Sequence, residues 1–510
     1  MTYSRLWQLK EWRLDRLREY IKEEGVWATF LSFGRVLLGI LCILAAIATN
    51  APEPFLIAGV LAAAGILQII LRKQPYPVWT TKAKMIVGLS VVTNAVILLL
   101  ADHYSPFSIL HSPFVVVLPY LQPLVVTIAW VLLFPVDRYL KRRIMDRARR
   151  LRDRHPDLTV IGITGSVGKT TTKELIAHIL SGKQSVLVTP EHVNTEMGVS
   201  QWIIQALANR KSQIAIVEMG AYRRGEIALL CSIAKPSIGV LTHIGSQHVG
   251  LFGSLEHLRE AKTELLMSLP GDGQAFVNGD CAPCREAAKR AQCPVTLVGT
   301  GGHLDLEAFE IEERPEGIRF RVNGTTVDVA LHGTHNVSNV LLAIAVARHL
   351  GLDMAVIATR LRSFAAPSKT FRVRTERSVT ILDDTHNASE ASMEAAIAWA
   401  RTRPEKQKIL VTPGLIELGE MEERTHEKLG ALAKGVFDDV LFTNKKSAQH
   451  FARGYGKNVH MISEWKQRVQ PGSLLVCVGR MPTGVMEKLL PLTSPLPRGE
   501  GNMVASETPL

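Results

Sequence analysis

The chain has 510 residues, of which 47% are hydrophobic, and a formal net charge of +12. This length is too great for one hydrophobic core and predicts about three domains. Six scattered cysteines exclude a disulfide-rich secreted protein and predict reduced thiols. Residues 138–154 hold nine Arg and Lys against two Asp. Because this basic run follows an apolar segment, we expect membrane lipids with anionic headgroups, and no nucleic acid, as the partner.

Residues 27–136 contain four apolar runs that are long enough, or nearly so, to span a bilayer: 28–49, 55–71, 85–101 and 114–136. Residues 1–26 carry six Arg and Lys and residues 72–84 carry four, whereas the other two connecting loops carry none. The positive-inside rule therefore places both ends of this four-helix transmembrane domain in the cytoplasm. We predict a multi-pass protein of the inner (cytoplasmic) membrane with cytoplasmic catalytic domains. Residues 1–26 would form a juxtamembrane helix and residues 137–156 a basic linker.

Residues 157–360 alternate short apolar runs with helix-like stretches, which predicts an α/β domain with a parallel sheet. The candidate strands are 160–164, 214–218, 238–244 and 274–278. The first is followed by a Gly-rich turn, 165–168, and by a predicted helix, 169–180.

This turn has the features of a phosphate-binding loop. Glycine lets backbone N–H groups approach phosphate oxygens, Lys169 can reach the β- and γ-phosphates, and the Thr170 hydroxyl can bind Mg²⁺. The pattern predicts a P-loop domain that binds ATP and Mg²⁺. The other loop residues expected at the nucleotide are Gly165, Gly168 and Thr171.

Ligands of parallel sheets bind beyond the carboxyl ends of the strands. Glu218 ends the second candidate strand and is a natural Mg²⁺ ligand. His248, which follows the third, could be a metal ligand or a capped loop histidine, and its position leaves both open. Cys281-Ala-Pro-Cys284 has the spacing of half a metal site, but no second pair completes it, so a plain loop is expected.

Several motifs follow one another between Leu158 and Leu490: Gly165-Ser166-Val167-Gly168-Lys169-Thr170-Thr171, Glu218-Met219-Gly220, Ala261-Lys262-x-Glu264, Gly333-x-His335-Asn336-x-x-Asn339 and Asp383-Asp384-x-x-Asn387-Ala388. This order resembles the Mur ligases, ATP-dependent amide ligases of peptidoglycan precursor synthesis. The resemblance is greatest to the branch that adds D-alanyl-D-alanine to a UDP-N-acetylmuramoyl-tripeptide. It implies an ATP-binding central domain, 157–360, and a smaller doubly wound C-terminal domain, 361–490. Residues 491–510 are rich in Pro, Ser and Gly, which predicts a disordered tail.

The resemblance also implies roles for residues of the central domain. Lys169 would hold the γ-phosphate, and Thr170 with Glu218 would hold a first Mg²⁺. His248 and a carbamylated Lys262 would bind a second Mg²⁺. Without the resemblance, Lys262 beside an acidic residue would be interpreted as surface charge.

Further implied roles concern the base and the ribose of ATP. Asn336, and less strongly His335, would bind the adenine side, although both could instead satisfy backbone groups where a helix begins. Arg372, after the hinge near 361–370, would contact the γ-phosphate, and Asp384 would contact the ribose.

The chain departs from the family pattern at four places. The predicted membrane domain stands where the family's UDP-binding domain is usual, and His243 stands where an asparagine is usual. The usual Tyr-Asn-Ala-Asn is His386-Asn387-Ala388-Ser389, and a usual Lys-Gly-Ser is replaced near Cys477-Val478-Gly479-Arg480. These last two changes lie in the part that receives the incoming amine, so its identity is left open. We therefore predict a membrane-tethered, ADP-forming ligase that joins a carboxylate-bearing peptide precursor to an amino acid or dipeptide, with a UDP or a lipid carrier left open. Two alternatives are a poly-γ-glutamate-synthetase-like ligase and a membrane transport or signalling ATPase.

Overall fold

The structure, a computed structural model, describes residues 78–104, 114–182, 185–208, 212–245, 249–365, 371–385, 388–416, 418–457, 459–481 and 484–491. The chain divides into two compact units, Met1–Asp146 and Arg147–Leu510.

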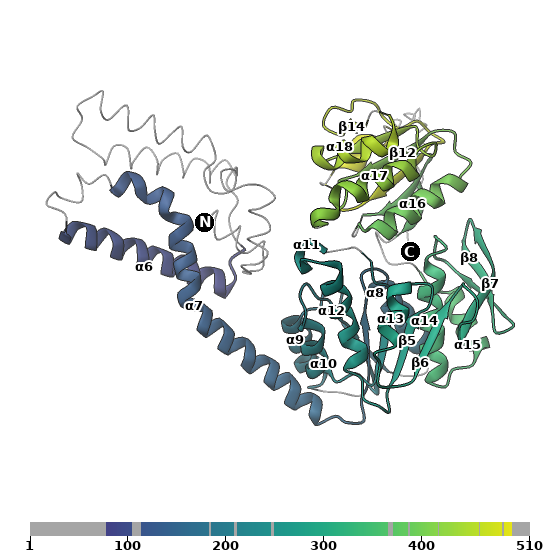
Figure 1. Cartoon of the computed structure of the whole chain (residues 1–510), viewed down its shortest axis with the longest axis horizontal. Helices are drawn as coiled ribbons and strands as arrows, with labels where there is room; N and C mark the ends of the chain where they lie inside the picture. Colours follow the sequence, from purple (N-terminus) through teal and green to yellow (C-terminus); the bar gives the residue numbers. More distant parts are fainter. Residues whose placement is uncertain are drawn as a thin grey trace, which may run out of the picture. The chain divides into compact units, whose positions relative to one another are not determined.

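In the first unit, the described residues form helix α6, Thr81–Tyr104, and most of helix α7, Phe114–Asp153 (Figure 1). They contain the third and fourth predicted spans, whereas the first two spans and the predicted helix in residues 1–26 lie outside the described residues. By length and composition, one described helical segment could cross a membrane, Leu121–Asp153. Of the two predicted spans that lie in the described residues, 85–101 and 114–136, only the second overlaps this segment.

Polar side chains join α6 to α7. Gln122 Nε2 donates to Asn94 Oδ1 at 2.9 Å, and Lys82 Nζ lies 2.8 Å from Asp137 Oδ2. Helix α7 then continues without a break through residues 137–153, which were predicted to be a basic linker. Near its end, in the second unit, the buried Arg152 donates to Ala234 O at 2.9 Å and to Leu158 O at 3.0 Å.

The ATP-domain sheet has nine strands in the order β2-β3-β1-β4-β5-β6-β7-β8-β9, parallel up to β7 and antiparallel from β7 to β9. The predicted strands 160–164, 214–218 and 274–278 are confirmed. The strand predicted at 238–244 is shorter, because β4 ends at Leu241. The strands are β1 (Thr159–Thr164), β2 (Val186–Val188), β3 (Ile214–Glu218), β4 (Ile238–Leu241), β5 (Gln274–Asn278), β6 (Val295–Gly299), β7 (Leu306–Arg314), β8 (Gly317–Val322) and β9 (Thr325–Val329).

Helices cover both faces of this sheet, as the alternation of side chains along β1 requires. Ile161 and Ile163 pack into one buried cluster with α8 (Lys169–Leu180), α14 (Asn336–His349) and α15 (Met354–Arg362). The glycine between them, Gly162, faces Leu265 of the opposite layer. The remaining helices are α9 (Glu196–Ala206), α10 (Glu226–Ala234), α11 (Val249–Phe252), α12 (Leu255–Met267) and α13 (Ala282–Ala288) (Figure 1).

The C-terminal domain has a six-stranded sheet in the order β10-β11-β15-β12-β13-β14, and only the β10–β11 pair is antiparallel. Buried clusters lie on both of its faces, as predicted for a small doubly wound unit. Its strands are β10 (Arg372–Glu376), β11 (Val379–Asp384), β12 (Lys408–Thr412), β13 (Asp439–Phe442), β14 (His460–Met461) and β15 (Leu474–Val478). Its helices are α16 (Glu390–Thr402), η2 (Gly419–Met421), α17 (Glu422–Ala433), α18 (Lys445–Tyr455) and α19 (Val485–Leu489). The predicted hinge falls largely on 366–370 and the predicted tail on 492–510, both outside the described residues.

Candidate active site

The loop between β1 and α8 needs glycine at both of its ends. Gly165 has φ of 154° and Gly168 has φ of 86°. A Cβ atom would lie 2.0 Å from Thr242 Oγ1 at Gly165 and 2.4 Å from Asn339 Oδ1 at Gly168. Only glycine avoids these contacts, and its absent side chain lets an anion approach the backbone of the loop closely.

Neighbouring strand ends hold this loop in place. Thr242 Oγ1, at the end of β4, donates to Val167 O at 2.5 Å. Gly245 N donates to Ser166 Oγ at 3.1 Å, and Ser166 N donates to His243 O at 2.6 Å. The loop is therefore preorganised by the segment that follows β4.

Lys169 begins α8 and folds back over the loop. Its Nζ donates to Gly165 O at 2.8 Å and to Ser166 O at 3.3 Å. Burial lowers the pKa of Lys169, and the nearby Glu218 carboxylate acts in the opposite direction. The ammonium group thus lies where a phosphate held by the loop would meet it.

Glu218, at the end of β3, is nearly inaccessible and is held by three side chains. Thr170 Oγ1 donates to its Oε2 at 3.1 Å, Asn194 Nδ2 donates to its Oε1 at 3.2 Å, and Lys173 Nζ lies 3.3 Å from Oε2. Burial alone would raise the pKa of Glu218, but Lys169, Lys173 and these hydrogen bonds lower it overall. An ionised carboxylate beside a hydroxyl offers the hard oxygen donors that Mg²⁺ prefers, so the residues present fit this ion.

Lys262 lies on α12 and is only 3% exposed, so it is not the surface charge that the sequence alone suggested. Burial lowers the pKa of Lys262 to about 7, and the positive charge of Lys169 adds to this effect against Glu226 and Glu264. Glu264 instead accepts the backbone N–H groups of Gly225, at 2.6 Å, and Ala228, at 3.0 Å, where α10 begins. His248, the other predicted ligand of a second metal ion, lies outside the described residues.

A pocket of about 870 Å³ opens beside the phosphate loop. Its lining comes from the loop, the segment after β4, the ends of β5 and β6, and the start of α14. The polar lining includes His243, Asp280, His335 and Asn339. We interpret it as the place for the base side of a nucleotide, because it continues directly from Gly168.

The start of α14 brings two of its polar residues to the pocket. His335 and Asn339 line the pocket, whereas Asn336 does not. Asn336 Nδ2 donates to His332 O at 2.8 Å, and its Oδ1 accepts from Asn339 Nδ2 at 2.9 Å. Burial lowers the pKa of His335 to about 4, and its Nδ1 has no hydrogen-bond partner in the described part of the chain.

The two predicted site residues of the C-terminal domain lie at the start of β10 and the end of β11. Arg372 is exposed, while Asp384 is 4% exposed and accepts Phe371 N at 3.1 Å through Oδ1. Its Oδ2 has no partner among the described atoms, and burial raises the pKa of Asp384 to about 7. Neither residue lines the pocket, to which the C-terminal domain contributes Ala391.

Sequence reasoning assigned no role in the site to three residues that the structure places there: Lys173, Asn339, which was named only as part of a motif, and Cys281, which was expected in a plain loop. Lys173 is fully buried on α8 and contacts Glu218. It lies one helical turn after Lys169, and this spacing was the one signal that could have identified it.

Comparisons with known proteins agree with this geometry. The Mur ligase middle domain matches residues 163–347. The UDP-N-acetylmuramoyl-tripeptide–D-alanyl-D-alanine ligase of Synechocystis sp. is 34% identical over 329 residues, which cover 62% of this chain and 71% of that protein. The ligase of the same name from Bacillus subtilis is 33% identical over 299 residues, 58% of this chain and 64% of the relative.

Solved structures of MurF ligases have a fold similar to that of this chain. A crystal structure of MurF from Acinetobacter baumannii superposes with a TM-score of 0.62 at 28% identity, covering 68% of this chain and 79% of that one. The MurF ligase of Thermotoga maritima in complex with ADP gives a TM-score of 0.60 at 28% identity, covering 68% and 82%. The chain belongs to the Mur ligase family and is an ATP-dependent peptide ligase.

Proposed function

We propose that this ligase forms the amide bond between a peptide precursor of peptidoglycan and D-alanyl-D-alanine. The names of its relatives support this substrate pair. The observation that carries the proposal is the phosphate loop with Lys169 folded over it and the Thr170 hydroxyl bonded to Glu218. The relatives give no reason to prefer a poly-γ-glutamate-type ligase or a transport ATPase.

The reaction has two bond-forming steps. A carboxylate oxygen of the precursor attacks the γ-phosphorus of ATP, and ADP leaves. The amine of the dipeptide then attacks the carbonyl carbon of the acyl phosphate, an N–H proton is lost, and phosphate leaves. Lys169 and Arg372 would stabilise the charge on the transferred group, and a closed cleft would keep water from the intermediate.

Thr170 and Glu218 would hold Mg²⁺, which neutralises phosphate charge when bound. Lys262 and His248 would hold a second ion. With a pKa near 7, a large part of Lys262 is a neutral amine at neutral pH. A neutral amine can attack CO₂ through nitrogen and lose a proton, which yields the carbamate that can act as a carboxylate-like ligand.

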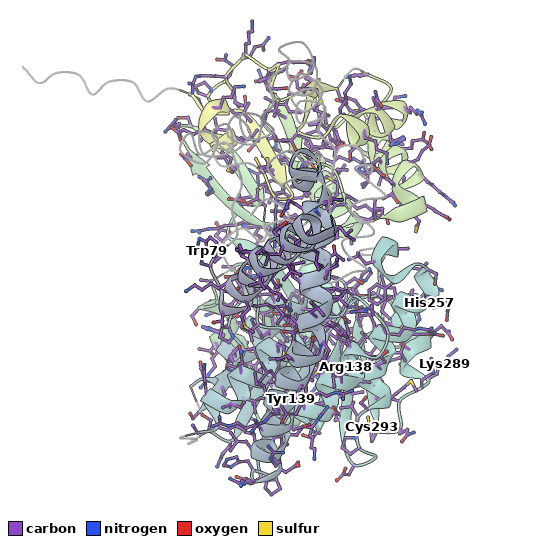
Figure 2. All side chains as sticks on the ribbon, turned by 90° about the vertical axis from the view of Figure 1, so that its left-hand side faces the viewer. Trp79, Arg138, Tyr139, His257, Lys289 and Cys293 are labelled. Carbon is purple, nitrogen blue, oxygen red and sulfur yellow. The ribbon has the colours of Figure 1, made fainter. Side chains whose placement is uncertain are left out.

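We also propose that the ligase is attached to the inner (cytoplasmic) membrane. Large apolar side chains on α7 face outward, with Val131 53% and Leu132 58% exposed. An exposed apolar helix is stable in lipid but not in water. The exposed basic residues that follow on α7 suit anionic headgroups, and Figure 2 shows the first of them, Arg138, beside Tyr139.

An acceptor screen tests the substrate proposal. Phosphate release from ATP is measured with a UDP-linked or a lipid-linked muramyl tripeptide, each with D-alanyl-D-alanine, glutamate or no amine. We expect release that requires both the tripeptide and D-alanyl-D-alanine. Release that requires glutamate, or that proceeds without any amine, would contradict the proposal.

Attachment is tested separately by fractionating cells that express the full chain. We expect the protein in the membrane fraction after an alkaline wash and in solution after detergent. Recovery in the soluble fraction without detergent would contradict the attachment and leave the reaction unaffected.

A further inference from the structure

A thiol pair and a histidine form a second reactive cluster on the wall of the nucleotide pocket. Cys281 and His243 line the pocket of about 870 Å³, together with Gly168 of the phosphate loop and His335 of α14. Cys281 is 5% exposed, and Cys284, three residues later, is fully buried. The reaction proposed above uses none of the three, and any group attached to Cys281 would occupy space in the pocket.

The two cysteines lie three residues apart at the start of one helix. Cys281 is the N-cap of α13, so the pair begins a helix where a plain loop was expected. Cys284 N donates to Cys281 O at 2.9 Å, which fixes the two residues on one turn. Side chains three residues apart lie on the same face of a turn, within the range that a disulfide spans.

The two thiols differ in their acidity. A hydrogen bond from Cys284 lowers the pKa of Cys281 to about 4, burial acts against it, and His243 lowers it further. Burial raises the pKa of Cys284 well above its usual range. Cys281 is therefore the nucleophile of the pair, and Cys284 keeps its proton.

The other thiols in the described part of the chain lack this environment. Burial raises the pKa of Cys231 to about 12 and also raises that of Cys293. Because the thiolate is the reactive form, these cysteines serve as internal controls for the behaviour of Cys281.

We propose that Cys281 and Cys284 are a modification site of the nucleotide pocket that reacts with low-molecular-weight disulfides. The Cys281 thiolate attacks one sulfur of the disulfide RSSR, forms a mixed disulfide and releases RS⁻. Cys284 then gives its proton to a thiolate and attacks the Cys281 sulfur, which expels the second RS⁻. The two protein thiols are oxidised to a disulfide, and RSSR is reduced to two RSH.

The position of Cys281 connects this chemistry to nucleotide binding. Its Sγ lies 3.8 Å from Ile244 O, in the segment that also contacts Ser166 of the phosphate loop. The group added to Cys281 and the base side of ATP would compete for the same space. This part of the inference rests on the proposed function, because it requires that the pocket holds the nucleotide.

The experiment treats the full-length protein with hydroxyethyl disulfide, quenches it with iodoacetamide and maps the peptides by mass spectrometry. We expect the wild type to lose two hydrogen atoms at the Cys281–Cys284 peptide. Cys284→Ser should keep one hydroxyethylthio group on Cys281, and Cys281→Ser should show neither change. Cys293→Ser is the matched control and should behave as the wild type, and thermal unfolding of each variant verifies its fold.

Protection by nucleotide separates two claims: that Cys281 belongs to a reactive thiol site, and that the pocket binds the nucleotide. ATP with Mg²⁺ at ten or more times its dissociation constant should slow the modification of Cys281 about tenfold. Modification of Cys281 no faster than that of Cys231 or Cys293 would overturn the thiol site, whatever the ligase activity. Rapid modification that ATP does not slow would instead overturn the nucleotide role of the pocket.

Discussion

The two ends of the nucleotide pocket are built in different ways. At the phosphate end, the loop and Lys169 come from one continuous segment between β1 and α8. At the base end, the polar lining comes from four separate segments, after β4, after β5, after β6 and at the start of α14. The first end depends on local backbone geometry, and the second depends on how the sheet and helices pack.

Because the two ends are built differently, we expect substitutions at each end to affect the enzyme differently. Charge on the transferred phosphate must be stabilised at the first end, where a single lost cation affects the transition state directly. Contacts at the second end hold the nucleotide in both the ground state and the transition state, so their loss mainly weakens binding. Substitutions at the two ends should therefore separate turnover from affinity.

The largest effect is expected for Lys169→Met, which keeps the apolar stem and removes the ammonium group. We expect kcat/KM for ATP-dependent ligation to fall on the order of 10³-fold, because no other described cation contacts the loop carbonyls through hydrogen bonds. Initial rates of phosphate release measure this effect. Lys289→Ala, on a side chain that is 70% exposed, is the matched control and should leave the rate unchanged.

A smaller loss of turnover is expected for Lys262→Ala, on the order of 100-fold. Lys262→Arg should be as inactive, because a guanidinium cannot capture CO₂ and stays charged. Removing dissolved CO₂ from the assay should slow the wild type and have no further effect on either variant. An active Lys262→Arg variant would exclude the carbamate.

Asp384, at the end of β11 in the C-terminal domain, should make stability depend on pH. Burial raises its pKa to about 7 in the folded protein, so the folded state binds more protons than the unfolded state between about pH 4 and pH 7. The free energy of unfolding should therefore fall as pH rises through this window, by about 2 kcal/mol from pH 5 to pH 7. Urea unfolding followed by tryptophan fluorescence measures this change, and Asp384→Asn should abolish it.

The sequence predicted the phosphate end almost completely, because its geometry is local. A β-branched run, two glycines and a lysine within ten residues fix the strand, the turn and the helix from Lys169 to Leu180. Parallel pairing of β1 with β3 then places Glu218 beside Thr170, as the rule of strand carboxyl ends requires.

The base end could not be predicted in this way. His335 and Asn336 are adjacent, and their residue types do not reveal which one faces the cavity once α14 has formed. Cys281 comes close to the segment after β4 only because β5 pairs with β4. The burial of Lys262 also depends on tertiary packing, since α12 carries charged residues on both sides of it.

The smallest expected effect is on ADP binding, and it tests whether Asn339 or Asn336 at the start of α14 contacts the nucleotide. Asn339 lines the pocket, whereas Asn336 supports it from behind through a hydrogen bond of 2.9 Å. We expect Asn339→Ala to weaken ADP binding about tenfold, the loss of roughly one hydrogen bond to a buried group, and Asn336→Ala to weaken it less. Equilibrium dialysis measures both affinities, and turnover at saturating ATP should stay near that of the wild type. A larger effect from Asn336→Ala would mean that the residue favoured by the motif, and not its neighbour one turn later, contacts the base.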